Sequence, residues 1–215
     1  MTKIYQFPMF RVESQLFHVP GAGYDGGLTA GGAQFITPEP GGFGVLEIMP
    51  AIIDTEWIDP AASWLMSKID GQVMRVRLAA SPQIAWSLKR NNQLDWDWVN
   101  PVGPRTEAVS TFTATALKGE TAVAVDISEL GRLLRPGHVI GHAFDCYLVD
   151  EIEYAGSVAN IVVKPPLRRD IAVNDECLFT PWFTGRISNG ADIRAAYNNL
   201  GHVKPGNIVL HEAVL

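Results

Sequence analysis

Glycine and proline recur at short intervals through the first 50 residues of this chain. Glycine favours turns, and proline lacks a backbone donor and interrupts helices. Over all 215 residues the two types make up about 16% of the chain, against a usual share of about 12%. The intervals leave room for strands of about four to eight residues. The pattern therefore predicts a fold of short strands joined by many turns.

Length and composition narrow the class of protein. A chain of 215 residues holds one domain with an ordinary core, or one domain with a small insertion. Hydrophobic residues make up 47% of it and charged residues 19%, which is too apolar for a disordered protein. The net charge of −6 provides no basic field for a nucleic-acid backbone. Because neither a signal-peptide pattern nor a run of 18 apolar residues occurs, we expect a soluble protein made in the cytoplasm, without membrane insertion.

Two adjoining segments have the clearest local patterns. The segment Asp59–Asp70 is predicted to be a helix, because Asp59 can cap its first turn, Pro60 fits the first helical position and Gly71 follows its end. Apolar residues at spacings of three and four form a stripe along it, which we expect to pack on a sheet. The next segment, Gln72–Leu78, alternates with the period of a half-buried strand.

Short apolar runs predict further strands along the rest of the chain. Their spacing of roughly ten residues is typical of a sandwich or barrel. A weak second helix is predicted for Asp192–Leu200, and the apolar final ten residues need cover from their own sheet or from a partner. The predicted strands are Gly44–Met49, Thr111–Ala116, Thr121–Val125, His138–Gly141, Phe144–Asp150, Ala159–Lys164 and Cys177–Thr180.

The segment 82–106 has a different character from the rest of the chain. Turn residues enclose three of the six tryptophans, Trp86, Trp96 and Trp98, and the last two alternate with aspartates. We expect a Trp-rich insertion or long hairpin, projecting from a β domain made of residues 1–81 and 107–215. Aromatic faces beside carboxylates are what sugar sites use. Burial of these tryptophans against the sheet or a neighbouring subunit is favoured over sugar binding, because aromatic residues dominate cores and interfaces.

No set of residues has the spacing of a catalytic or ligand-binding motif. The glycine-rich stretch Gly21–Gly32 lacks a phosphate-loop pattern, so we expect a surface loop there. His138 and His142 lie four residues apart in a predicted strand, where about 13 Å would separate them, so a metal pair is not expected. The sequence therefore predicts no catalytic residue, cofactor or metal site, and no enzyme. The acidic residues Asp145, Asp150, Glu151 and Glu153 lie near strand ends, where such charges usually face solvent.

The cysteines and the arginines leave alternatives open. Cys146 and Cys177 are the only cysteines; two reduced thiols are favoured, and a single bridge between them stays open. Arg168 and Arg169, together with two arginines near residue 134, give local positive charge in an acidic chain. Arginines of this kind usually face solvent, but arginine is also the charged residue preferred at protein interfaces. The two other arginines are Arg132 and Arg135.

Two groups of segments have distinctive local patterns. In the first group, a strand ending near a glycine-containing turn leads through a helix with a Trp and a terminal Gly to another strand. In the second group, a strand opened by Gly-[Asp/His]-x-Ile, a Tyr-x-Val strand and a Val-rich strand run into a Pro-Pro-Leu-Arg corner. The segments are Gly32–Gln34, Gly41–Ile48, Trp64–Gly71 and Met74–Arg77, then Leu134–Gly141, Tyr147–Val149 and Ala159–Arg168. Together they resemble the distal tail proteins of long-tailed bacteriophages and gene transfer agents.

This resemblance implies a mainly β fold of the tail-tube type, a sandwich or barrel with one packed helix. It also implies a structural virion protein of the tail tip, made in the host cytoplasm, which forms a hexameric ring between the tail tube above and the baseplate hub below. A tail-tube or tail-terminator subunit is the nearest alternative. The other alternative is a carbohydrate-binding module that contacts the host surface through Trp86, Trp96 and Trp98. Arg168 and Arg169 are the further candidates for interface contacts.

Overall fold

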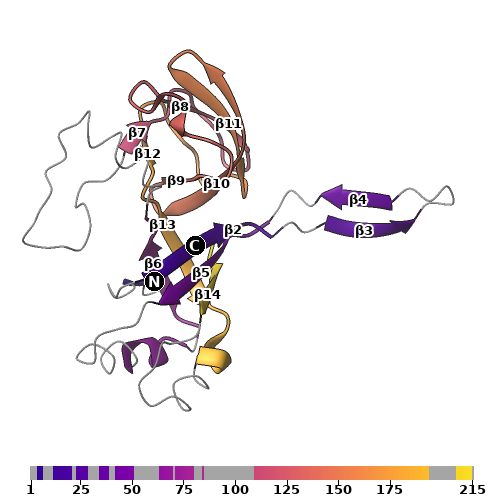
Figure 1. Cartoon of the computed structure of the whole chain (residues 1–215), viewed down its shortest axis with the longest axis vertical. Helices are drawn as coiled ribbons and strands as arrows, with labels where there is room; N and C mark the ends of the chain where they lie inside the picture. The colour runs from indigo at the N-terminus through magenta and orange to yellow at the C-terminus, as the bar shows by residue number, and fades with distance from the viewer. Residues whose placement is uncertain are drawn as a thin grey trace, which may run out of the picture.

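The chain folds into two six-stranded β-sheets and a separate two-stranded ribbon (Figure 1). The computed structural model describes residues 4–6, 12–20, 23–28, 34–38, 42–50, 63–69, 71–79, 84, 109–193 and 207–214. Most of these residues lie in strands, and helical residues are few. The predicted mainly β fold of the sandwich type is therefore confirmed.

The first sheet lies in the middle of the molecule (Figure 1) and is built from both ends of the chain. All its neighbouring strands are antiparallel except β1 and β6, which are parallel. Its strands, in spatial order, are β1 (Ile4–Gln6), β6 (Val73–Arg77), β13 (Trp182–Ile187), β14 (Ile208–Glu212), β5 (Val45–Pro50) and β2 (Val12–His18).

The second sheet is formed by one continuous part of the chain, and all its pairs are antiparallel. It is strongly curved, because a bridge between Phe112 and Val125 brings its two outer strands together. Its strands, in spatial order, are β7 (Val109–Thr111), β12 (Glu176–Leu178), β9 (Val139–His142), β10 (Asp145–Ala155), β11 (Val158–Lys164) and β8 (Ala122–Asp126).

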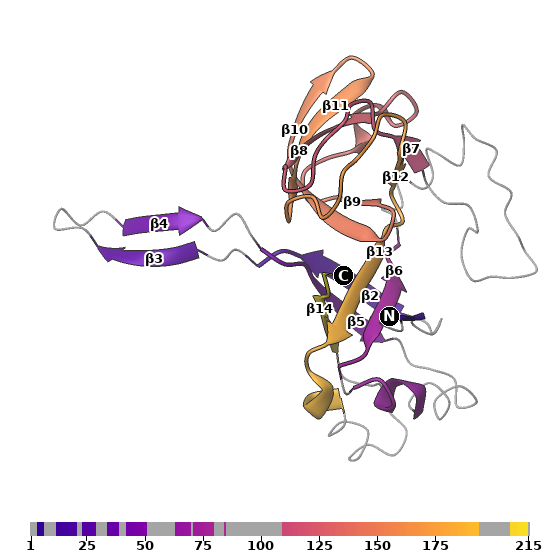
Figure 2. The ribbon, with the colours of Figure 1, turned by 180° about the vertical axis from the view of Figure 1, so that it is seen from behind.

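The ribbon consists of β3 (Gly23–Leu28) and β4 (Gln34–Pro38). Among the described strands, these two pair with each other and with no other strand. The ribbon extends away from both sheets when the molecule is seen from the front and from behind (Figures 1 and 2). The expectation of a surface loop over Gly21–Gly32 was therefore wrong, because antiparallel pairing with Gln34–Pro38 turns half of it into a strand.

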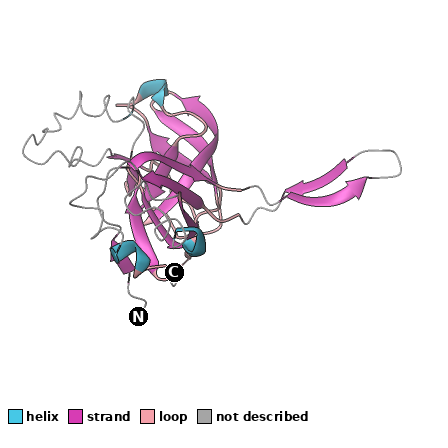
Figure 3. Cartoon of the chain, turned by 60° about the horizontal axis from the view of Figure 1, so that its bottom comes forward, coloured by secondary structure: helices cyan, strands magenta, loops and turns pink. Residues whose placement is uncertain are grey.

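The described helical residues are short pieces at the edges of the sheets (Figure 3). Within the predicted helix Asp59–Asp70, residues 63–66 are helical and residues 67–69 form a turn, so the helix ends four residues before its predicted end. Leu65 is buried in the cluster of the first sheet, as the apolar stripe predicted. Residues 190–193 are helical, which begins two residues before the predicted Asp192–Leu200 helix. A single 3₁₀ turn, η1 (Gly131–Leu133), precedes β9.

Two hydrophobic clusters form the core, and the β9–β10 hairpin contributes to both. Along β10, Tyr147 and Val149 point into the cluster enclosed by the second sheet. Cys146 and Leu148, which alternate with them, contact the cluster of the first sheet. A strand that is apolar on both faces is what burial on both sides requires. The hairpin thereby joins the two sheets into one packed body.

Several strand predictions differ from the structure in their bounds. The predicted strand Thr111–Ala116 is wrong: the strand is β7, Val109–Thr111, and beyond it Phe112 and Ala116 form only isolated bridges. The structure extends β10 to Ala155, because residues 151–155 pair with β11 after a register shift. No strand was predicted over Trp182–Ile187, where the structure has the central strand β13.

Candidate functional site at the junction of the two sheets

Charged residues from both sheets meet where β14 ends and where the chain leaves β11. The segment after β11 begins with Pro165 and Pro166, which cannot continue the ladder as donors. Leu167 is buried in the cluster of the second sheet, and the backbone N–H of Arg168 donates to the Tyr147 hydroxyl at 3.1 Å. These contacts hold the following two arginine side chains at the junction.

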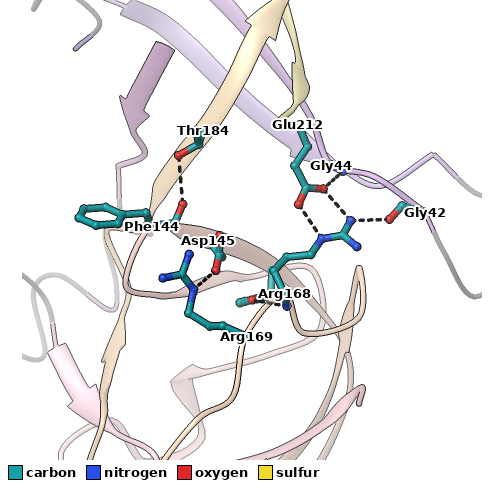
Figure 4. Close-up of polar contacts among 9 residues, drawn as sticks. Gly42, Gly44, Phe144, Asp145, Arg168, Arg169, Thr184 and Glu212 are labelled. Carbon is teal, nitrogen blue, oxygen red and sulfur yellow. Dashed lines mark hydrogen bonds and ion pairs between the residues drawn. The ribbon is translucent and has the colours of Figure 1, made fainter. Parts of the chain in front are cut away.

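Arg168 forms a bidentate ion pair with Glu212, the last residue of β14 (Figure 4). Its Nε donates to Glu212 Oε1 at 2.7 Å and its Nη2 to Oε2 at 3.0 Å. The same Nη2 donates to the carbonyl of Gly42 at 3.0 Å, while the N–H of Gly44 donates to Glu212 Oε2 at 2.7 Å. Hydrogen bonding to Glu212 raises the pKa of Arg168. The pair therefore joins the segment after β11 to β14 and to the segment that leads into β5.

Arg169 forms an ion pair with Asp145, the first residue of β10. This contact is more exposed than the Arg168 pair, since Arg169 keeps 45% of its side chain accessible. Its hydrogen bond to Asp145 raises the pKa of Arg169. Within the described part of the chain, both arginines that the sequence singled out as interface residues thus have carboxylate partners.

A third arginine, Arg75 of β6, lies beside these pairs without an ion pair among the described residues. Its guanidinium carbon stands 3.6 Å from the centroid of the Phe144 ring. Its Nε donates to Thr184 Oγ1 at 3.5 Å, and the Thr184 hydroxyl donates to the Phe144 carbonyl at 3.3 Å. Burial lowers the pKa of Arg75, and the nearby charge of Arg169 lowers it further.

These side chains surround a cavity of about 140 Å³. The groups around it can bind an anion or hold the sheets together. The lining of the cavity contains no nucleophile next to a general base. The lining residues are Arg75, Phe144, Asp145, Arg168, Arg169, Thr184, Ala213 and Val214.

Tyr147 lies next to this lining, as the acceptor of the Arg168 backbone N–H. Burial raises the pKa of the Tyr147 hydroxyl strongly, so this group stays neutral and acts as a hydrogen-bond partner.

The two histidines in β9 and its preceding turn are used separately. His142 Nε2 lies 3.1 Å from Asp175 Oδ2, and its ring packs edge-on against Phe112. His138 Nδ1 accepts a hydrogen bond from the backbone N–H of Arg135 at 3.1 Å. Burial and the Arg135 charge lower the pKa of His138. Each histidine has its own local partner, and the structure does not bring the two together in one site.

The acidic residues that the sequence grouped together lie along β10 rather than around one point. Asp145 pairs with Arg169, and Asp150 Oδ2 lies 2.8 Å from Lys164 Nζ. Glu151 and Glu153 are exposed. Over the ranges that the structure describes, no group of three or more His, Cys, Asp or Glu side chains could hold a metal ion.

Cys146 and Cys177 are both free and fully buried. They belong to different hydrophobic clusters, Cys146 to that of the first sheet and Cys177 to that of the second. Burial raises the pKa of both thiols well above the ordinary value. The structure therefore contains two protonated thiols and no bridge between them.

The four arginines of the sequence prediction do not form one patch. Arg132 lies in η1, with its guanidinium carbon 5.4 Å from the ring centroid of Tyr154 near the end of β10. Arg169 is bonded to Asp145 at the start of the same strand. The two contacts therefore lie toward opposite ends of β10. Arg135 is exposed in the turn before β9.

Three residues of this junction were missed by the sequence analysis: Arg75, Phe144 and Glu212. The alternation in Gln72–Leu78 placed Arg75 on the polar face of a strand, which was the only local signal. Nothing local indicates that Glu212 meets Arg168, because 44 residues separate them. Trp86, Trp96 and Trp98 lie outside the described residues; within 82–106 the structure describes Ile84, which is buried in the cluster of the second sheet.

None of the helices in the described ranges is long and apolar enough to cross a membrane. No protein-family model matches the chain, and no curated protein sequence matches it.

Proposed function

We propose that this chain is a structural subunit of a phage tail tip, which assembles as a hexameric ring between the tail tube and the baseplate hub and performs no catalysis. The proposal begins from the resemblance of the sequence to distal tail proteins. The observation in the structure that supports it is the ribbon, which among the described strands pairs only with itself.

The ribbon pairs only with itself among the described strands, and it extends away from both sheets (Figures 1 and 2). A two-stranded hairpin is marginally stable in water unless it packs against something else. A second copy or an adjacent ring would supply that packing. Arg168 and Glu212 also bond Gly42 and Gly44, in the segment that leads into β5.

The first sheet also has two unpaired edges, formed by β1 and β2 among the described strands. The β2 edge spans seven residues, Val12–His18; Glu13 and a register shift lie at its start, before Ser14, and the edge contains neither lysine nor proline. Both residues are common devices that prevent an edge from pairing with another chain. Leu16 in β2 is 57% exposed. An edge of this kind suits a heterologous contact, in which subunits join edge to edge around a ring.

The direct test is the mass and shape of the purified protein. Native mass spectrometry is expected to find six copies of the 23.5 kDa chain, about 141 kDa, and negative-stain images are expected to show rings. Replacing residues 23–38 by a short Gly-Asn-Gly turn keeps the β2–β5 hairpin and is expected to reduce assembly. Exposed Ala122→Ser on β8 is the matched folding control. A wild-type protein that stays monomeric at tens of micromolar would contradict the proposal.

The position in the tail and the role of the tryptophans need separate measurements. Immunogold labelling of particles is expected to place the protein at the tip. Labelling along the tube would favour the tail-tube alternative, and labelling at the head-proximal end would favour the terminator.

The glycan-binding alternative through Trp86, Trp96 and Trp98 stays a prediction. Binding to a glycan array that Trp96→Ala abolishes without loss of assembly would favour it.

A further inference from the structure

The cavity at the junction of the sheets has an excess of positive charge. Its lining contains the guanidinium groups of Arg75, Arg168 and Arg169 and one carboxylate, Asp145. Glu212 adds a second carboxylate next to Arg168. Both carboxylates are already bonded to an arginine. Among the described residues, the third arginine, Arg75, forms no ion pair, although the charge of Asp145 also acts on it.

Arg75 is positioned to receive a carboxylate. Phe144 covers one face of the guanidinium, and Thr184 uses its Nε. The two terminal nitrogens have no hydrogen-bond partner among the described residues, and a carboxylate accepts from such a pair in bidentate geometry. The arginine is held in place by stacking and by Thr184, so it loses little conformational freedom when it binds.

The size and rim of the cavity indicate what binds there. A volume of about 140 Å³ accommodates the end of an Asp or Glu side chain and is below the range of about 300–1,000 Å³ that is typical of ligand pockets. Two exposed apolar residues, Phe144 at 43% and Val214 at 61%, stand on its rim. A small free anion gains no stabilisation from an apolar rim. A protein surface that carries a carboxylate, in contrast, buries the rim residues when it binds. Arginine and aromatic residues are also the types enriched in the centres of interfaces.

We propose that this cavity binds an aspartate or glutamate side chain of a second copy of the chain, with Arg75 as its ion-pair partner. A second copy fits this site because the chain carries 23 acidic residues against 17 basic ones, so its surface supplies carboxylates. The assignment rests on the proposed ring in one respect, that copies of the chain meet. Arg75 is then a residue of the subunit interface, and Arg168 and Arg169 position the elements around it.

The test compares the assembly of Arg75→Met, Arg75→Glu and Arg75→Lys by sedimentation velocity and native mass spectrometry. Methionine keeps the length that covers Phe144 and removes the charge, so the association constant is expected to fall at least about tenfold. Glutamate is expected to leave monomers, and lysine to retain part of the assembly. Arg186→Glu is the matched control, since Arg186 is exposed two residues after Thr184 on β13. Unchanged circular dichroism and urea midpoints establish that each variant folds.

The outcomes separate this site from the ring itself. A wild-type ring with monomeric Arg75→Glu and an assembled Arg186→Glu supports the site. If Arg75→Glu leaves the ring intact, or if Arg75→Glu and Arg186→Glu disrupt it equally, the carboxylate site is overturned. The proposal that the wild type forms a ring is then unaffected. If the wild type is monomeric, both the proposed ring and the proposal that a second copy occupies the cavity are overturned. Titration of that monomer with glutarate, followed at the Arg75 Nε–H NMR signal, then decides the chemistry: a saturable shift identifies a site for free carboxylates, and no shift overturns carboxylate binding.

Discussion

The guanidinium of Arg168 and the carboxylate of Glu212 share two hydrogen bonds, of 2.7 and 3.0 Å, across the junction of the two sheets. The side chains are 19% and 12% exposed. The carboxylate also accepts from Gly44, and the guanidinium also donates to Gly42. One charge pair thereby stabilises three parts of the molecule, and removing either partner leaves the other charge poorly compensated.

We expect Arg168→Met or Glu212→Leu to lower the free energy of unfolding by about 2–3 kcal/mol, somewhat less than the loss of one partner from a fully buried pair. Urea denaturation measures this loss, and the double variant gives the coupling of the pair. Lys164→Met is the matched control, because its pair with Asp150 is exposed and is worth about 0.5 kcal/mol. Equal losses for Arg168→Met and Lys164→Met would contradict the role assigned to Arg168.

Gly141 in β9 is expected to tolerate no side chain. A Cβ atom there would contact the Cβ of Pro181 and lie 2.8 Å from the carbonyl oxygen of Asp145. Backbone atoms cannot give way as a flexible side chain can, so Gly141→Ala is expected to cost about 1–3 kcal/mol. Thermal or urea unfolding measures the cost. The control Ala122→Ser, on the exposed face of β8, is expected to change the free energy of unfolding by less than about 0.5 kcal/mol. A similarly small effect of Gly141→Ala would show that β9 and Pro181 are further apart.

Stability is expected to fall at alkaline pH. Burial raises the pKa of the Cys146 and Cys177 thiols above the usual 9.0, so above pH 9 the unfolded chain loses protons that the folded chain keeps. The contribution is complete below pH 9 and is lost as pH rises, by up to about 1.4 kcal/mol per pH unit for each thiol. Urea titrations between pH 8 and 10.5 measure this slope. The Cys146→Ala/Cys177→Ala variant is expected to have a shallower slope, and an equal slope would assign the effect to other groups.

The two thiols are expected to be unreactive in the native protein and free in the unfolded one. Both are buried and unpaired, and a buried neutral thiol is a poor nucleophile. A thiol reagent added without reductant is expected to label neither cysteine under native conditions and both in denaturant. Absence of free thiols in denaturant would show that the two cysteines pair.

The sequence predicted the elements whose side chains follow a local period. In Gln72–Leu78 the alternation placed Met74 and Val76 on the buried face and Arg75 on the other, and β6 has this arrangement. The apolar stripe of the helix before it identified Leu65 as a core residue. The predictions that concern residues 82–106 fall outside the described chain, apart from Ile84.

Glycine was the least reliable signal. Gly21–Gly32 resembled a loop in composition, yet pairing with Gln34–Pro38 makes Gly23–Leu28 a strand. Gly185 lies inside β13, where a Cβ would be only 2.7 Å from the carbonyl oxygen of His211, so the close approach of β14 favours glycine there. In both cases a partner strand, which lies elsewhere in the sequence, determines what the glycine does.

The sequence by itself determined that the chain forms many strands and few helices, and that strands such as β6 alternate between a buried and a polar face, because these properties depend on neighbours one to four residues away. Only the tertiary structure decided which residues contact one another across the chain. Arg168 and Arg169 looked like a free patch until the fold brought Glu212 and Asp145 to them, and Cys146 and Cys177 could have paired until β10 and β12 placed them in different clusters. Contacts between residues as far apart as Gly42 and Arg168, 126 positions in sequence, depend on strand order and register, which long-range packing sets and local pattern does not encode.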